Sequence, residues 1–306
     1  MTAASGMSRG DYLRALGVVV IWGLNFVVMK LGLQALSPML LGALRFAVAS
    51  LPFVLFVPRP RMPWRFVAIY GLVQGLGQFG LLFVAIQLGM TAGMASVVMQ
   101  TQAFFTMILA GPLLGERARG HQWLGLCVAA LGLVVIAAGH GEGPGQMTLI
   151  GFVLTLGAAF MWATSNLVVR FAGRVAADYD PFAFIVWSSL IPIVPFVVLA
   201  VASEGLAHSW LSVTQMGPRE GFAVLYLALL ATLLAYTMWT RLLKRHTAGR
   251  VAPFSLLAPV VGLWAASAAF GEQLPAAQWL GTTAVLVGLL INQVGPHLFR
   301  RLRAGC

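Results

Sequence analysis

Charged residues are scarce in this chain of 306 residues: only 9% are Asp, Glu, Lys or Arg, whereas 60% are hydrophobic. Soluble domains carry about 25% charged residues, so this composition cannot cover a surface that faces water. The mean hydropathy of +0.90 favours membrane-spanning helices, and we predict an all-α membrane protein. Cysteine is also rare. Cys127 lies in an apolar run and Cys306 at the end, which makes a disulfide framework unexpected.

Acidic residues and histidines are absent from the centres of the apolar runs, which excludes several kinds of chemistry. Proton relays and cation sites normally need an ionisable group inside the membrane, so a proton-coupled exchanger of lipophilic cations is not expected. The sequence also lacks a metal-binding cluster in these runs and a phosphate-binding GxxxxGK[ST] motif. We therefore expect no cofactor, no metal and no enzymatic activity. The alternative from another class, a membrane-embedded lipid-modifying enzyme, would need more acidic residues in one loop than Asp178 and Asp180.

The chain contains ten apolar runs, each close to the roughly 20 residues that a helix needs to cross the hydrocarbon core. Gly, Pro or charged residues separate most of them. The runs are residues 13–31, 39–57, 66–88, 92–114, 121–139, 148–171, 181–201, 222–243, 251–270 and 276–294. The longest connection, from about residue 202 to residue 221, is expected to be a small surface loop.

The 19 Lys and Arg residues gather in short clusters between these runs, and their distribution predicts the orientation. With the N-terminus inside, sixteen of them fall on the inner side, Lys30 and Arg219 fall on the outer side, and Arg45 falls within the second run. Positive charge marks the cytoplasmic segments of membrane proteins. We predict a multi-pass membrane protein with both termini cytoplasmic. The same clustering argues against nucleic acid as a partner.

One stretch of the chain occurs twice. Residues 91–135 return as residues 247–291 at a constant offset of 156 positions, with the same GE turn and the same QWLG sequence. Because each copy is displaced from the other by five runs, an odd number, the two must cross the membrane in opposite directions. We predict two inverted five-helix repeats, residues 1–140 and 146–296, followed by a basic cytoplasmic tail, residues 297–306. Inverted repeats with polar groups near the midplane are typical of secondary transporters.

Asparagine and tryptophan occur together in the middle of two repeat-related runs. Trp22 and Asn25 in the first run resemble Trp162 and Asn166 in the sixth, and each pair lies about one turn apart on one helix face. Two interpretations of the amides remain open. They line a cavity, or they join neighbouring helices by hydrogen bonds.

Four glutamines lie in the third and fourth runs. Gln74 and Gln78 share a helix face, whereas Gln100 and Gln102 point about 200° apart on an α-helix, so at most one of these two faces a cavity squarely. Unsatisfied amides in hydrocarbon cost several kcal/mol. A wet cavity is therefore favoured over mutual pairing.

The eighth and ninth runs add aromatic and helix-breaking residues. Thr232, Tyr236 and Trp239 share one face of the eighth run at mid-depth, which argues against an interfacial aromatic belt. Pro253 and Pro259 remove backbone donors from the ninth run, which predicts a kink or a broken helix.

Arg45 is the one charge that falls inside a predicted span. It could meet a substrate that carries a carboxylate, but we favour the alternative that it snorkels outward or pairs with backbone carbonyls. Organic phosphates would usually need several cations, so a phosphate translocator is not favoured.

Glycines recur at equivalent positions in the last run of each half. Gly125 and Gly132 have Gly281 and Gly288 as counterparts. Small residues let helices approach closely. They either serve packing within one chain or form the seam of a homodimer.

Several segments together resemble a known family. They are VVVIWGLNFVVMK at 18–30, LRF at 44–46, LLGERARGHQWLGLCVAALGLVVI at 113–136 and VAPFSLLAPVVGLWAASAAFGE at 251–272. Over nearly its whole length the chain resembles the EamA-type exporters of the drug/metabolite transporter superfamily. It is most similar to the bacterial exporters of O-acetylserine and cysteine, with aromatic amino-acid exporters as near relatives. The resemblance implies a ten-helix inner-membrane protein with a central cavity between runs one, three, four, six, eight and nine. The small multidrug branch uses a Glu in its first helix, which this chain lacks.

These observations converge on a secondary transporter that exports amino acids or related small zwitterionic metabolites by alternating access. Its partners would be this solute and the lipid bilayer, with a homodimer as an option. The alternative within transport is a carrier of other neutral metabolites or drugs. The residues expected to bind substrate are Trp22, Asn25, Gln78, Phe79, Phe83, Gln100, Trp162, Asn166, Tyr236 and Trp239.

Overall fold

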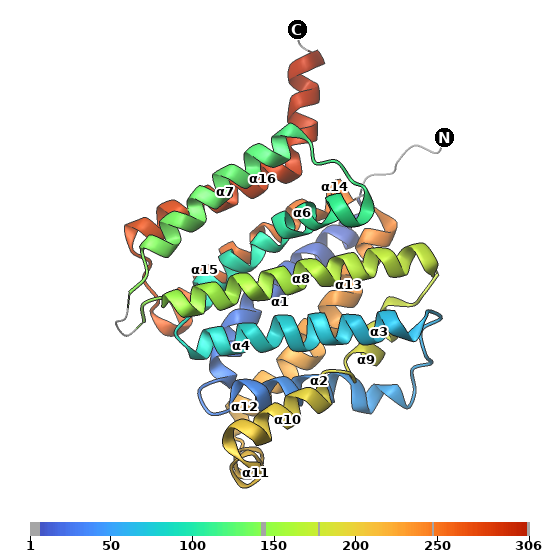
Figure 1. Ribbon diagram of the computed structural model, residues 1–306, viewed down its shortest axis with the longest axis vertical. Coiled ribbons are helices and arrows are strands. Elements are labelled where there is room, and N and C mark those ends of the chain that lie inside the picture. Colours follow the sequence, from blue (N-terminus) through green and yellow to red (C-terminus); the bar gives the residue numbers. More distant parts are fainter. Residues whose placement is uncertain (1–6, 142–144, 177, 247, 305–306) are drawn as a thin grey trace.

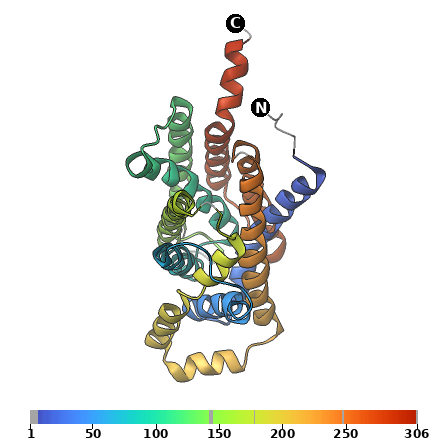
Figure 2. The ribbon, with the colours of Figure 1, turned by 90° about the vertical axis from the view of Figure 1, so that its right-hand side faces the viewer.

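The computed structural model describes residues 7–141, 145–176, 178–246 and 248–304. The side chains at 244, 248, 249, 252 and from 294 onward are outside this description, so those of the predicted basic tail, residues 297–306, are too. The described residues form a bundle of helices without a strand, as predicted (Figure 1). The long helix α8 (Leu149–Val175) and the helical stretch Trp64–Gln87 run side by side across the bundle, and Figure 2 shows several helices end-on.

The helices of the first half follow one another with short connections. They are α1 (Arg9–Gly32), α2 (Pro38–Val54), α3 (Trp64–Tyr70), η1 (Gly71–Phe79), α4 (Gly80–Gln87), α5 (Ala92–Val98), η2 (Met99–Thr101), α6 (Gln102–Leu114) and α7 (Gly120–Ala138).

The second half repeats this order. Its helices are α8 (Leu149–Val175), α9 (Pro181–Ser188), α10 (Ile193–Glu204), α11 (Leu206–Thr214), α12 (Pro218–Leu225), η3 (Tyr226–Leu234), α13 (Ala235–Arg245), α14 (Ala248–Ser255), α15 (Leu257–Phe270) and α16 (Ala276–Ala304).

Eight helical stretches within the described residues are long and apolar enough to cross a membrane, and α2 is a shorter apolar helix. Together, these eight stretches and α2 correspond to the first nine predicted runs. The tenth, residues 276–294, lies within α16. An all-helical membrane protein is therefore confirmed, whereas the exact number of ten crossings stays a prediction.

The helix ends follow local sequence signals. Ser37, Thr91 and Thr148 precede α2, α5 and α8, and each side-chain oxygen accepts a hydrogen bond from a backbone N–H of the first turn. Gly115 and Gly271 end α6 and α15 with φ of 70° and 64°, a left-handed conformation that favours glycine. The repeated GE turn therefore stops a helix in the same way in both halves.

Five of the long helical stretches are interrupted near their middle, the seventh between α9 and α10, and the other four interruptions form pairs that the repeat relates. The π-helical segments η1 and η3 interrupt the third and eighth runs, and their starts are almost one repeat offset apart. The fourth run changes to a 3₁₀ turn at η2, and the ninth breaks at Leu256, between α14 and α15. Such interruptions leave backbone groups outside the regular α-helical pattern and often mark functional positions.

The repeated glycines bring α7 and α16 into backbone contact. A Cβ atom added to Gly132 would lie 2.6 Å from the carbonyl oxygen of Gly281, and one added to Gly281 would lie 2.6 Å from that of Gly132. Gly125 and Gly288 face each other in the same way, so the two helices run antiparallel. These glycines pack within one chain, which is the first of the two interpretations. A homodimer stays a prediction and would need another surface.

The connection between the seventh and eighth runs is not the surface loop that we expected. Gly205, at φ 82°, turns the chain, and α11 follows at the lower end of the bundle in Figure 2. Its Leu206, Trp210 and Leu211 are exposed, whereas Ser209 is buried and donates to the Glu204 carboxylate over 2.9 Å. An amphipathic helix with exposed apolar residues suits the membrane interface.

Candidate functional site

Four predicted aromatic side chains meet in the middle of the bundle. The Trp22 ring on α1 lies 6.3 Å from that of Trp162 on α8, 5.2 Å from that of Tyr236 and 5.3 Å from that of Trp239 on α13. Each of the four residues is half-buried. Both halves therefore contribute to one cluster, which we call the aromatic cluster.

A hydrogen-bonded chain adjoins this cluster at Tyr236. Gln74 on η1 donates to the Tyr236 hydroxyl over 2.8 Å, and Ser165 on α8 donates to the Gln74 side-chain oxygen. Because the hydroxyl accepts from Gln74, its own hydrogen is available for another acceptor. Sequence reasoning did not select Ser165, although its place one turn beyond Trp162 on the same helix was a usable signal.

Three predicted site residues carry buried polar atoms that have no hydrogen-bond partner within the described residues. These atoms are Nε1 of Trp22, Oδ1 of Asn25 and Oε1 of Gln78. The other end of Asn25 makes only a weak contact, from Nδ2 to the Met29 sulfur at 3.7 Å. An unsatisfied buried polar atom costs about 1–3 kcal/mol. Folding therefore leaves hydrogen-bonding capacity in this region that a solute or water can use.

Gln100 has a structural contact in this conformation. Its Nε2 donates to the Ser255 carbonyl over 2.5 Å. That carbonyl lies four residues before Pro259, which has no N–H to bond it. Gln100 thus satisfies the group that the predicted break in the ninth run releases, and it ties the two interrupted runs together.

Asn166 pairs with the fourth run instead of facing Asn25. Its Nδ2 donates to Oε1 of Gln102 over 2.8 Å and to Oγ1 of Thr106 over 3.2 Å. Of the two glutamines in the fourth run, Gln102 therefore meets the amide of the sixth run. Asn166 therefore fits the interpretation of an amide that joins helices. For Asn25, the interpretation of an amide that lines a cavity stays open.

Phe79 and Phe83 lie deeper than the aromatic cluster. Both are buried in the main hydrophobic core, with ring centroids 6.0 Å apart, and Phe79 also packs against Phe46 at 5.8 Å. They form the wall behind Gln78 in this conformation.

Arg45 does not snorkel and does not pair with carbonyls, so our favoured interpretation of it was wrong. Its side chain is completely buried, and its Nε donates to the Thr232 hydroxyl over 2.9 Å. The guanidinium carbon lies 3.8 Å from the centre of the Phe79 ring. The helix α2 packs against η1 and η3, and the residues that hold the side chain, Phe79 and Thr232, come from these two segments.

An ion pair joins the two halves at the end of α1. Lys30 Nζ lies 2.7 Å from Glu272 Oε1, and the same carboxylate accepts hydrogen bonds of 3.0 Å from the backbone N–H groups of Ala92 and Gly93. The carboxylate is thus placed at the N-terminus of α5, where the helix dipole favours negative charge. We call this contact the Glu272 latch.

The repeat-related glutamate makes a looser contact at the other end of the bundle, where α8 ends. Arg170 Nη1 lies 2.9 Å from Glu116 Oε2. About half of each side chain is exposed, at 47% for Arg170 and 49% for Glu116. We call it the Glu116 pair.

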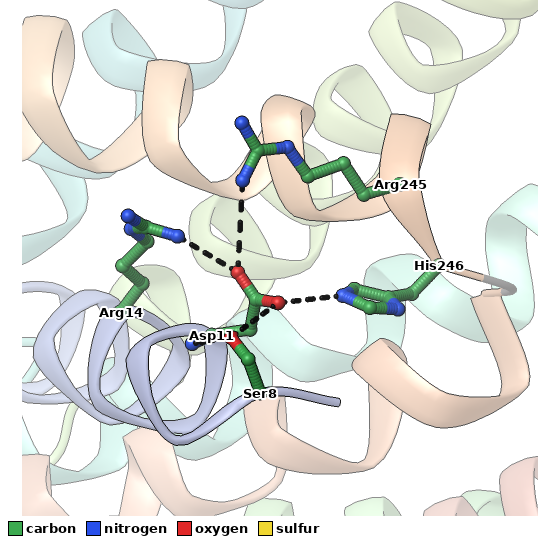
Figure 3. A network of polar contacts seen from close by, with 5 residues as sticks. All are labelled: Ser8, Asp11, Arg14, Arg245 and His246. Atoms are coloured by element: carbon green, nitrogen blue, oxygen red, sulfur yellow. Dashed lines mark hydrogen bonds and ion pairs between the residues drawn. The ribbon is translucent and has the colours of Figure 1, made fainter. Parts of the chain in front are cut away.

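A third charged cluster joins the start of α1 to the end of α13, as Figure 3 shows. The Asp11 carboxylate lies 2.8 Å from Arg14 Nη1, 3.0 Å from His246 Nε2 and 3.8 Å from Arg245 Nη1. Ser8 donates to it as well, over 2.9 Å. This Asp11 cluster fixes α1 against α13 on the face where the chain begins.

A groove of about 460 Å³ lies beside the Glu272 latch, between Lys30, Phe270 and Gln278. A much smaller cavity of about 20 Å³ lies between α2, η1, α9 and η3, lined by Phe46, Gln74, Phe79, Thr232 and Tyr236, among others. The first is an opening at one end of the bundle and the second adjoins the aromatic cluster. Within the described residues, no three His, Cys, Asp or Glu side chains gather as a metal site would need.

Comparison with known proteins identifies close relatives. A protein of Salmonella typhimurium named a probable amino-acid metabolite efflux pump is 42% identical over 297 residues, which cover 97% of this chain and 99% of that protein. A protein of the same name from Escherichia coli is 40% identical over 98% of this chain and 100% of its own length. A probable terminal-alkyne amino-acid exporter of Streptantibioticus cattleyicolor is 26% identical, covering 90% of this chain and 91% of that protein.

The fold is also found among solved structures. A crystal structure with 21% sequence identity matches this chain with a TM-score of 0.64 and covers 97% of this chain and 99% of its own, which supports the fold alone. Residues 11–138 and 149–293 each match the EamA-like transporter family. Because these matches span most of the sequence, the chain belongs to the EamA-like transporter family.

Proposed function

We propose that this protein is a secondary transporter that exports amino acids or related small zwitterionic metabolites across the bacterial inner membrane. Two relatives of about 40% identity over nearly the full length bear the name amino-acid metabolite efflux pump, which supports this solute class. Membership of a transporter family favours transport over an enzymatic role. Both termini would be cytoplasmic, so the start of α1 and the Asp11 cluster would face the cytoplasm.

The observation that carries the proposal is the partly unsatisfied polar site beside the aromatic cluster. Trp22, Asn25 and Gln78 hold unpartnered buried polar atoms next to aromatic faces from α1, α8 and α13. Hydrogen-bonding groups fix the polar end of a small solute and aromatic walls bind its apolar part. The two ends of an amino acid match these two surfaces.

The mechanism would be alternating access between two inverted five-helix halves, residues 1–140 and 146–296, with ten membrane crossings. The antiparallel contact of α7 with α16 and the paired interruptions in the third, fourth, eighth and ninth runs support this symmetry. In the conformation described, the Glu272 latch holds the end of α1 against the N-terminus of α5. This contact would close the periplasmic face, and release of the latch would open it.

Export would follow the metabolite gradient, because no Asp or Glu lies deep within a predicted span, where it could couple protons. Flux from proteoliposomes with and without a pH gradient tests this point. Equal flux is expected, and a strict requirement for the pH gradient would contradict it.

A growth experiment tests the function itself. Cells of a bacterial host that overproduce the chain should tolerate toxic amino-acid analogues better than control cells, and Trp22→Ala should remove the protection. Trp264→Ala is the matched control, because this tryptophan on α15 is 71% exposed and takes no part in the aromatic cluster. If the inserted wild-type protein protects against no analogue, the proposal is wrong.

A further inference from the structure

The buried guanidinium of Arg45 is the feature that the proposed binding site does not yet use. The side chain is 0% exposed, and its Nη1 has no hydrogen-bond partner within the described residues. Thr232 holds its Nε, and Phe79 covers its face. A positive charge is therefore held in one orientation with part of its hydrogen-bonding capacity unused.

No carboxylate of the described chain compensates this charge. The ion pairs of the other basic residues, such as Lys30 with Glu272 and Arg170 with Glu116, all lie at helix ends. Removing a charge from water without a partner is costly, and the ring of Phe79 offsets only part of that cost. Charges that proteins keep inside membrane spans generally serve a function there.

The Thr232 hydroxyl that holds the guanidinium is itself held by a hydrogen bond to the backbone. Its hydroxyl accepts from Arg45 and donates to the Leu227 carbonyl over 2.8 Å, five residues earlier in the π-helical segment η3. Both hydrogen-bonding directions of Thr232 are thus in use. The interruption of the helix supplies the acceptor that orients Thr232, and Thr232 in turn orients Arg45.

The guanidinium lies next to the aromatic cluster. Thr232 and Phe79, which contact it, line the small cavity together with Tyr236, and Tyr236 packs against Trp22 at 5.2 Å. The Tyr236 hydroxyl accepts from Gln74 and keeps its own hydrogen for an incoming acceptor. The guanidinium therefore lies directly behind two residues that line this cavity, and the Tyr236 hydroxyl donor lines the same cavity.

We propose that Arg45 binds the carboxylate of the transported amino acid, with the Tyr236 hydroxyl as a second donor and Thr232 as a positioning residue. The proposal rests on the function proposed above. An arginine is the side chain best suited to a carboxylate, because its N–H groups match the geometry of the two oxygens. The ammonium end then lies toward the aromatic faces, which attract cations.

The cavity of about 20 Å³ has room for about one water-sized group, so the carboxylate enters only when the aromatic cluster opens. Binding would therefore separate Trp22 from Tyr236, and tryptophan fluorescence can report it.

The test compares acids with amides on the full-length protein in detergent. Binding is measured by tryptophan fluorescence for L-phenylalanine, S-methyl-L-cysteine and O-acetyl-L-serine, each against its primary carboxamide. A charged hydrogen bond to the carboxylate predicts that the wild type prefers an acid to its amide by about 10- to 100-fold. Arg45→Gln should bring this ratio close to one, Thr232→Val should lower it less, and Arg241→Gln, at an exposed arginine of α13, should leave it unchanged.

The outcomes separate this inference from the function on which it rests. A wild type that binds none of the six compounds contradicts the proposed function. A wild type that binds acid and amide equally well overturns the role of Arg45, even if Arg45→Gln does not fold. A folded Arg45→Gln variant that keeps the wild-type ratio overturns it too, because a merely structural arginine would lower stability without changing that ratio.

Discussion

Two glutamates at equivalent positions of the repeat behave differently. Glu272 follows the helix-ending Gly271, pairs with Lys30 and accepts from two backbone N–H groups of α5, and only 6% of its side chain is exposed. Glu116 follows Gly115 and pairs with Arg170, but 49% of its side chain is exposed. In each case the cation lies near the end of the first long helix of the other half.

The comparison shows that one sequence element forms a tight latch on one face and a loose pair on the other. A symmetric scaffold with asymmetric closure is what a transporter stopped in one of two conformations should show. In the other conformation Glu116 would move to the first backbone N–H groups of α14, which the repeat relates to those of Ala92 and Gly93. The Glu272 latch would then loosen.

A second pair of contacts does not share this asymmetry. The Asp11 cluster joins the start of α1 to the end of α13, and Thr148 joins the start of α8 to the end of α4 by donating to the Leu88 carbonyl over 2.6 Å. Because contacts of this kind are present at both ends of the bundle, we expect them to persist through the transport cycle. The latch is the contact that we expect to change.

The largest effect is expected for Glu272→Gln. The substitution removes the charge that pairs with Lys30 and caps α5, and it should destabilise this face by about 2–3 kcal/mol. Hydrogen exchange measured by mass spectrometry should accelerate in the first turn of α5 and at the end of α1. Unchanged exchange in both segments would show that the latch does not hold this face closed.

Lys30→Met should have a smaller effect, about 1–2 kcal/mol, because Glu272 keeps its two backbone donors. Thermal unfolding in detergent of both single variants and the double variant measures the coupling. The losses of stability in the two single variants should not add in the double variant, since either substitution breaks the same ion pair. Full additivity would contradict a direct interaction.

Asp11→Asn should lower thermal stability by an intermediate amount, because the amide loses the attraction of Arg14, Arg245 and His246 but can keep a hydrogen bond to Ser8. Hydrogen exchange should rise at the start of α1 and at the end of α13. Exchange in α5 should not change, since the cluster lies at the other end of the bundle. A rise in α5 would link the Asp11 cluster to the latch and remove the distinction between them.

The smallest effect is expected for Glu116→Gln. Exposed ion pairs contribute at most about 1 kcal/mol, so thermal stability should stay close to that of the wild type. Transport should nevertheless fall, because the conformation with the cytoplasmic face closed would lack its latch. A variant that is as active as the wild type would mean that Glu116 never takes the place that Glu272 takes here.

The sequence could predict the helical runs, the repeat and the aromatic cluster, because each depends on a local pattern or on an internal comparison. Trp22, Trp162, Tyr236 and Trp239 lie on predictable faces of three predicted segments, and they meet. The helical character of α11 was missed, because its polar residues hid a short amphipathic pattern.

Partners across helices could not be predicted in this way. Gln100 bonds a carbonyl that a proline on another helix releases, and Asn166 bonds Gln102, which depends on the rotation and depth of both helices. Arg45 was expected to reach the membrane surface or backbone carbonyls, but Thr232 and Phe79 hold it inside. Periodicity gives the face of a helix but not the neighbour that the face will meet.

Solute counterflow in proteoliposomes tests the central claim most directly, because it requires a site that opens alternately to both sides and needs no energy source. Vesicles that contain the wild-type protein and unlabelled O-acetyl-L-serine or L-phenylalanine are placed in a trace of the labelled compound. We predict a transient accumulation of label above the equilibrium level, and its loss in Glu272→Gln. Uptake that only rises to equilibrium, or no uptake of either compound, would contradict alternating access to an amino-acid site.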